Sequence, residues 1–443
     1  MNTTMHAELS ALCREHPELK IEFHHQNWET DFLRFFRSQV NYNVRRESSH
    51  LTASVYKGQR SCSFSIEDPD MAAVREKLSE TLAIIDQLPP DPDFVDLEDD
   101  LRTVPQFEYV NNIDAVPLAT KVNILARLAS AVEPMGFRIY GTFICNHSHD
   151  RVINSNGVDK SMAHSPVMLE VKAVSDSNEV TVLQSYGGES LDRFDEEEFT
   201  RQLVGKVQAA TREVVDVDPG EYQVILSPRC LAEFLQYLSW LMSARALDQN
   251  ISPFEGKVGK KLFSEHVTVR DNPHHPGLIR CLYNSEGHLY QSLDIIENGV
   301  FRNFLVDNYY AHKTGLTKNG NVGMCLEFEP GDTSLDDMIA GVKRGLYVSS
   351  LHYMNFMNPR ETSVTGLTRD GTFLIKDGKL TRVVNNLRYT QRITEVLERI
   401  VCVEDTSVVV PFSTNYDNFA ILTAGMPHVL VDGFKISSST RTV

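Results

Sequence analysis

The sequence is poor in cysteine, and its few cysteines lie far apart. Seven occur among 443 residues, and no two of them form a CxxC pair. Zinc ribbons and disulfide-stapled folds depend on closely spaced cysteines. The cysteine pattern therefore argues against both classes of protein.

Long hydrophobic runs are also absent. No stretch reaches the roughly 18 apolar residues that a transmembrane helix needs. Residues 1–6, which read Met-Asn-Thr-Thr-Met-His, have neither the basic start nor the apolar core of a secretory signal. We therefore expect a cytoplasmic protein that has no membrane partner.

Positive charge is scarce, because 43 Lys and Arg residues face 60 Asp and Glu residues and the net charge is −17. Proteins that bind nucleic acids present clustered basic side chains to the phosphates, so we expect no nucleic-acid partner. The sequence also lacks a GxSxG elbow, a P-loop, a Rossmann glycine fingerprint and the surroundings of a papain-like cysteine. These absences leave the reaction class open.

The first half of the chain mixes helical and strand patterns. Apolar residues at helical spacing predict helices, and short β-rich runs between turn residues predict strands. The expected helices are residues 3–14, 71–88, 118–132 and 195–214. The expected strands are residues 19–23, 40–44, 51–56, 61–66, 137–144, 151–153, 167–173 and 179–186. This pattern predicts an α+β domain with antiparallel strands over residues 1–219.

The second half is richer in strand signals. A buried strand at 222–226 precedes a helix at about 230–247. Hairpin turns are expected at 284–287, 297–299 and 376–378, where Asn-Gly, Asp-Gly or a similar pair supplies positive φ angles. Helical patterns return only at 336–339 and 391–400. We therefore predict a mainly antiparallel β domain, a barrel or a sandwich, over residues 220–443.

Four segments of the second half occur in a distinctive order. Residues 252–264 read SPFEGKVGKKLFS, residues 267–273 read VTVRDNP, residues 296–307 read IENGVFRNFLVD, and residues 425–428 read GMPH. This order resembles the TldD/PmbA (TldE) family. The likeness extends over about residues 220–443, whereas the first half has a compatible layout with few diagnostic residues.

The resemblance implies a metal site that this chain has lost. Catalytic members of the TldD type carry HExxxH on the helix after the first strand of the C-terminal domain, together with a later cysteine. In this sequence Ala232 and Tyr237 occupy the two histidine positions, Glu233 remains, and Ser413 falls at the cysteine position within about one residue. Alanine has no lone pair, and neutral tyrosine or serine is a poor ligand for such ions. We expect no bound metal and no other cofactor, while Glu233 is either a structural residue or a surviving base.

Two histidine-bearing segments lie outside these motifs. Residues 146–150 read NHSHD and residues 271–276 read DNPHHP, and both are expected to form turns. Histidine-rich turns can bind metal, but polar surface is the favoured interpretation of each.

The resemblance is closest to the non-catalytic TldE/PmbA type and implies a partner. The leading hypothesis is a metal-free subunit of a TldD/TldE-type peptidase that processes unstructured or modified peptides, paired with a TldD-type catalytic subunit or with itself as a homodimer. Its substrate would be an extended peptide. Two alternatives stay open: a tailoring enzyme that reuses the fold in a biosynthetic pathway, and a homodimeric peptide-binding protein without chemistry.

Overall fold

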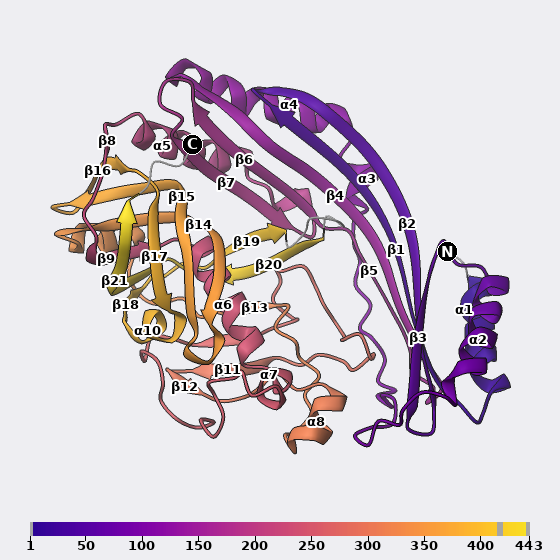
Figure 1. Cartoon of the computed structure of the whole chain (residues 1–443). Helices are drawn as coiled ribbons and strands as arrows, with labels where there is room; N and C mark the ends of the chain where they lie inside the picture. The colour runs from indigo at the N-terminus through magenta and orange to yellow at the C-terminus, as the bar shows by residue number, and fades with distance from the viewer. Residues whose placement is uncertain (1–2, 414–419, 440–443) are drawn as a thin grey trace.

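The first part of the molecule is a long curved sheet. The structure is a computed structural model that describes residues 3–413 and 420–439. The sheet has the order β3-β2-β1-β4-β6-β7, β5 pairs with β4, and every pairing is antiparallel. Figure 1 shows β1, β2 and β4 as an arch over the rest of the molecule. The strands are β1 (Lys20–Phe36), β2 (Gln39–Lys57), β3 (Arg60–Glu67), β4 (Phe137–Asn154), β5 (Asp159–His164), β6 (Val167–Ser175) and β7 (Thr181–Gly188).

Helices cover the two ends of one face of this sheet. These helices are α1 (Thr3–Glu15), α2 (Met71–Ile85), α3 (Asn112–Ala115), α4 (Leu118–Val132) and α5 (Glu196–Ala210). Leu9 of α1 and Leu78 of α2 pack with Ile21 of β1, whereas Leu128 of α4 packs with Phe143 of β4. Strand side chains alternate between two faces, so the covered face is buried at these two ends.

The second part contains a closed β-barrel. The circuit β14-β9-β21-β17-β15 returns to β14 and closes a barrel of five strands. β14 and β9 run parallel, and the other pairings of the circuit are antiparallel. The barrel and its flanking strands are β8 (Val214–Val215), β9 (Gly220–Leu226), β14 (Arg344–Asn358), β15 (Ser363–Lys376), β16 (Lys379–Val384), β17 (Leu387–Arg392), β18 (Ile400–Val403) and β21 (Val429–Ser439).

A smaller sheet and five helices complete this part. The sheet has the order β12-β11-β10-β13-β20-β19. Its strands are β10 (Val269–Asp271), β11 (Leu293–Glu297), β12 (Val300–Phe301), β13 (Leu326–Phe328), β19 (Val408–Ser413) and β20 (Ile421–Met426). The helices are α6 (Pro228–Leu241), α7 (Ala244–Asp248), α8 (Asn308–Thr314), α9 (Leu335–Gly341) and α10 (Ile393–Glu398). No helix within residues 3–413 and 420–439 has both the length and the apolar character needed to cross a membrane.

The predicted α+β class and the barrel are confirmed, and several local predictions are corrected. Gly299 and Gly378 have positive φ angles in hairpin turns, as expected. The helix predicted over 230–247 is wrong in extent, because it breaks after Leu241 into α6 and α7. The segment 146–150 is not a turn, because it lies within the long strand β4.

The division at residue 219 stays a prediction, and the apolar core crosses it. Leu203 of α5 and Val182 of β7 belong to the same buried cluster as Tyr347 of β14 and Phe373 of β15. The first sheet and the barrel therefore share part of one core.

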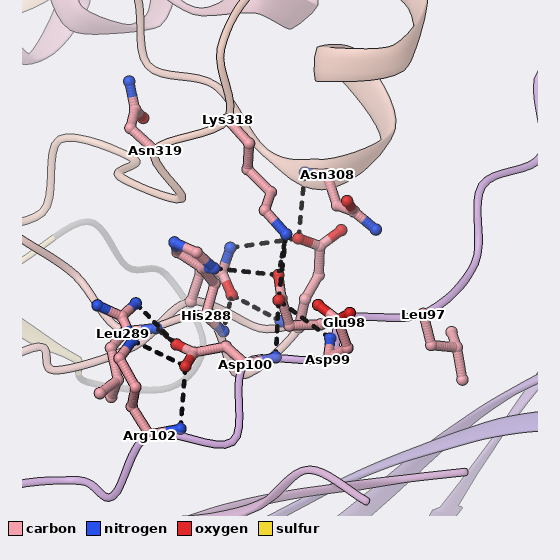
Figure 2. A network of polar contacts seen from close by, with 12 residues as sticks. Leu97, Glu98, Asp99, Asp100, Arg102, His288, Leu289, Asn308, Lys318 and Asn319 are labelled. Carbon is pink, nitrogen blue, oxygen red and sulfur yellow. Dashed lines mark hydrogen bonds and ion pairs between the residues drawn. The ribbon is translucent and has the colours of Figure 1, made fainter. Parts of the chain in front are cut away.

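A strap without helix or strand (residues 86–111) fastens the first part to the loops of the second. The side chain of Glu98 is only 1% exposed, and its carboxylate contacts His288 Nδ1 at 3.2 Å and Lys318 Nζ at 3.0 Å. Asp100 accepts a hydrogen bond of 2.9 Å from the backbone amide of Leu289. Figure 2 shows these carboxylates turned toward the basic side chains. Burial opposes ionisation of Glu98, but the contacts with His288 and Lys318 outweigh it and lower the pKa to about 2.

We expect Glu98→Gln to destabilise the protein by about 2–3 kcal/mol at pH 7 and by less at pH 3. The folded pKa lies below the unfolded one, so this stabilisation is complete above about pH 4.5 and is lost as the pH falls toward 2. Urea denaturation at both pH values measures the effect. The exposed neighbour Asp99 provides the control Asp99→Asn, which should change little. An equal loss at both pH values would contradict the assigned ion pairs.

Candidate functional site

Helix α6 carries the positions at which the family resemblance places metal ligands. It begins after Ser227, whose hydroxyl accepts a hydrogen bond from the backbone amide of Cys230 and so satisfies an amide of the first turn. Apolar residues at helical spacing bury one face of α6 in the core of the second part. The other face carries Glu233, Tyr237 and Trp240, which are only partly covered.

Both residues at the expected histidine positions have structural contacts. Ala232 is fully buried within the apolar cluster of the second part. The Tyr237 hydroxyl donates a hydrogen bond to the backbone carbonyl of Met354, and its ring lies 5.0 Å from that of Phe356. Neither side chain presents an imidazole-like lone pair toward Glu233.

Glu233 lies at the junction of α6 and the first sheet. Its carboxylate is 3.6 Å from Arg229, one helical turn earlier, and Arg229 also binds Glu170 of β6 at 2.9 Å. Burial raises the pKa of Glu233 to about 7; Arg229 opposes the shift and Glu170 adds to it. A carboxyl group that titrates near neutrality can act as a general base, and it can equally be the third member of a structural ion-pair network.

The fourth predicted position, Ser413, is the last residue of β19 and pairs through its backbone with Ile421 of β20. Both strands contact α6, so the fold brings the strand of Ser413 to the helix of Glu233. The Ser413 side chain itself lies outside the described part of the structure. The assignment of these four positions, and the absence of a metal there, stay predictions.

An apolar surface adjoins the open face of α6. Trp240 is 43% exposed, Tyr353 is 71% exposed and Met357 is 63% exposed. Phe356 of β14 packs against the Trp240 ring at 5.6 Å and so joins this strand to the helix. We call these four residues the α6–β14 patch. Exposed large apolar side chains on two contacting elements, α6 and β14, are typical of protein–protein contacts.

A cavity of about 640 Å³ lies beside β4 and was not anticipated from the sequence. It is lined in part by five histidines: His6, His25, His147, His149 and His164. The alternation His147-Ser148-His149 was the available signal, because a strand places both imidazoles on one face. Interpreting the segment as a turn concealed this arrangement.

Comparisons with known proteins identify the family. The sequence profile of the PmbA/TldA metallopeptidase C-terminal domain matches residues 219–438. The crystal structure of TldE from Thermococcus kodakarensis superposes with a TM-score of 0.87 at 22% identity and covers 98% of this chain and 100% of that chain. A metalloprotease PmbA homolog of Haemophilus influenzae is 23% identical over 80% of this chain and 80% of its own length. The chain belongs to the TldD/PmbA family.

Other TldD/PmbA relatives match over shorter stretches. A metalloprotease of Methanothermobacter thermautotrophicus is 26% identical over 58% of this chain, and the match spans 60% of that relative. A zinc metalloprotease TldD homolog of Saccharolobus solfataricus is 26% identical over 46% of this chain and 48% of its own length. The chain thus spans about half the length of these two relatives, and its likeness to TldE shows the family fold.

Replacing the carboxyl group of Glu233 tests its raised pKa. The folded protein retains this proton up to about pH 7, whereas the unfolded chain releases it near 4.5, so the cost of ionisation grows across that interval. We therefore expect Glu233→Gln to become more stable relative to the native protein, by about 1–3 kcal/mol, between pH 5 and pH 8. Denaturant titration of both proteins measures this difference, with the exposed residue variant Glu265→Gln as control. A difference independent of pH would show that the Glu233 carboxyl titrates normally.

Proposed function

We propose that the protein is a TldE/PmbA-like subunit that binds no metal and assembles with a TldD-type catalytic chain into a peptidase for unstructured or modified peptides. This proposal rests on two residues of α6. Ala232 is buried in the core, and the Tyr237 hydroxyl donates its hydrogen bond to a backbone carbonyl. The partner would supply HExxxH, in which two histidines hold the ion and the glutamate activates water.

The ion-pair network supports a structural role for this helix. A bound metal ion would connect α6 to neighbouring strands through its ligands. In this chain Arg229 of α6 makes a connection through its ion pair with Glu170 of β6. Such a half-buried pair would orient α6 relative to the first sheet without requiring a metal. This arrangement suits a subunit that shapes a shared chamber while its partner performs the chemistry.

The α6–β14 patch is the proposed contact with the partner. A stable interface buries roughly 800 Å² on each side, and tryptophan, tyrosine and methionine are enriched at its centre. Trp240, Tyr353 and Met357 provide this composition next to the altered site. An interface there would place the partner close to Glu233.

The edge of β2 that is free of β3 is a candidate binding site for the extended peptide substrate. β3 pairs with β2 only over the stretch from His50 to Lys57, which leaves the preceding residues of β2 with an outer edge free of β3. Val40 and Tyr42 are exposed along this edge. An extended peptide can add to such an edge through its backbone and needs little sequence specificity to do so.

Co-expression with a TldD-type chain that carries HExxxH tests the assembly. We expect the two chains to co-purify and the complex to cleave an unstructured peptide that neither chain cleaves alone. Tyr353→Asp should weaken association about tenfold or more, because it places a charge in the apolar contact. Ile84→Asp is the matched control, because Ile84 is 47% exposed on α2, far from α6 (Figure 1). Separate elution of the two chains, with no gain in cleavage, would contradict the proposal.

A tailoring enzyme that acts without a partner is the second candidate, and the raised pKa of Glu233 favours it. A base that titrates near neutrality could remove a proton from a substrate at physiological pH. Activity of the isolated chain that Glu233→Gln abolishes, while the fold is preserved, would support this candidate over the first.

A further inference from the structure

The histidines of β4 lie on the helix-covered face of the first sheet, in the interval between its two covered ends. Phe143 and Cys145 of β4 point into the core that contains α4. His147 and His149 continue the same alternating row toward α1, because every second side chain of a strand points to one face. The register between β1 and β4 places Glu29 opposite His147. The cavity described above opens along this row.

The two imidazoles approach each other as closely as ligands of one ion do. The Nε2 atoms of His147 and His149 are 3.0 Å apart. Two imidazole nitrogens that are each about 2.0–2.1 Å from one ion, at an angle between roughly 90° and 110°, lie about 2.9–3.4 Å apart. The observed separation falls within this interval. In the structure this contact is a hydrogen bond between the two rings, so a bound ion would take the place of the shared proton.

The surroundings of the pair favour a cation. The Tyr109 ring stacks on His147, with centroids 5.6 Å apart and planes inclined by 24°, which restrains the imidazole. The carboxylates of Glu29 and Asp114 lie near His147, and both share their charge with Arg45 through ion pairs.

Two arginines near the histidine pair form ion pairs with carboxylates. Arg45 forms an ion pair with Glu29, and Arg151 is bound by Asp159 at 2.8 Å. The positive charge of each arginine is therefore partly offset by a carboxylate.

We propose that His147 and His149 chelate one divalent transition-metal ion of the class that prefers imidazole: copper(II), nickel(II) or zinc. This site is separate from the altered positions on α6 and does not depend on the proposed subunit function. Within residues 3–413 and 420–439, no group of three or more His, Cys, Asp or Glu side chains is arranged to hold a metal. The remaining coordination positions therefore fall to water or to a donor group on a molecule in the cavity.

One feature of His147 limits the affinity that we expect. Its Nδ1 atom is buried and has no hydrogen-bond partner among the described residues. Ligating histidines usually donate this second proton to a protein acceptor, and the loss of such a partner costs about 10–100-fold in affinity. The site should therefore bind an ion reversibly, with an exchangeable position open to the cavity.

Copper(II) is the most informative probe, because this ion binds nitrogen ligands most strongly in the divalent series. The full chain, stripped of metal, is titrated with copper(II) and followed by calorimetry and electron paramagnetic resonance. We expect one ion per chain and a nitrogen coupling pattern from two imidazoles. His147→Ala and His149→Ala should each weaken binding at least about tenfold and reduce the pattern to one nitrogen.

Two variants control for other histidines. His274→Ala removes an exposed loop histidine and should leave copper binding unchanged. His25→Ala removes the partner that lies 2.8 Å from His6 and tests whether that second pair in the cavity holds the ion instead. Thermal unfolding of each variant confirms that it is folded.

The proposal is overturned if the native protein shows no two-imidazole signature, if His147→Ala and His149→Ala bind copper as well as the native chain, or if only His25→Ala loses it. If either β4 variant does not fold, the native protein and His25→Ala decide together, because the proposal requires two nitrogen couplings that remain when His25 is removed. Assembly with a TldD-type partner is measured separately, so failure at this site leaves that question untouched.

Discussion

Burial of α6 is the constraint on which the rest of the structure depends. Its apolar face fills the core of the second part, and the helix contacts the barrel strand β14 as well as β19 and β20 of the smaller sheet. Its first turn then reaches the first sheet through Arg229 and Glu170. One helix thus fixes the relative positions of three sheets, and a substitution on it acts on more than its local surroundings.

Under the proposed assignment of Ala232 and Tyr237 to the histidine positions, the contacts of α6 would accommodate the loss of both ligands. An alanine in place of a histidine costs little when the position faces an apolar core, as Ala232 does. A tyrosine can replace the second histidine when a backbone carbonyl accepts its hydroxyl proton, as that of Met354 does for Tyr237. Under that assignment, packing and hydrogen bonds would take over the structural part of the histidines' role.

The two parts of the molecule are joined by forces of different kinds. Near the barrel they share an apolar core that includes Leu203 and Phe373. At the far side, the strap of residues 86–111 contributes the buried carboxylate of Glu98, which contacts His288 and Lys318 (Figure 2). Apolar contacts do not fix the exact relative position of two surfaces. A buried carboxylate does, because it is stable only where its hydrogen-bond donors are in place. The strap therefore specifies how the arch of the first sheet sits over the loops.

The sequence by itself determined the α+β class, the hairpins at Gly299 and Gly378 and the family, because local periodicity, glycine turns and motif order are properties of short segments. It also pointed to Ala232, Glu233 and Tyr237 through their place in a motif. The folded structure was needed to show that Arg229 links Glu233 to Glu170, some sixty residues away in the chain, and that His147 and His149 face one cavity. Strand pairing and burial between distant segments create those environments. The alternation His147-Ser148-His149 signals at most a shared face, and only if the segment is recognised as a strand.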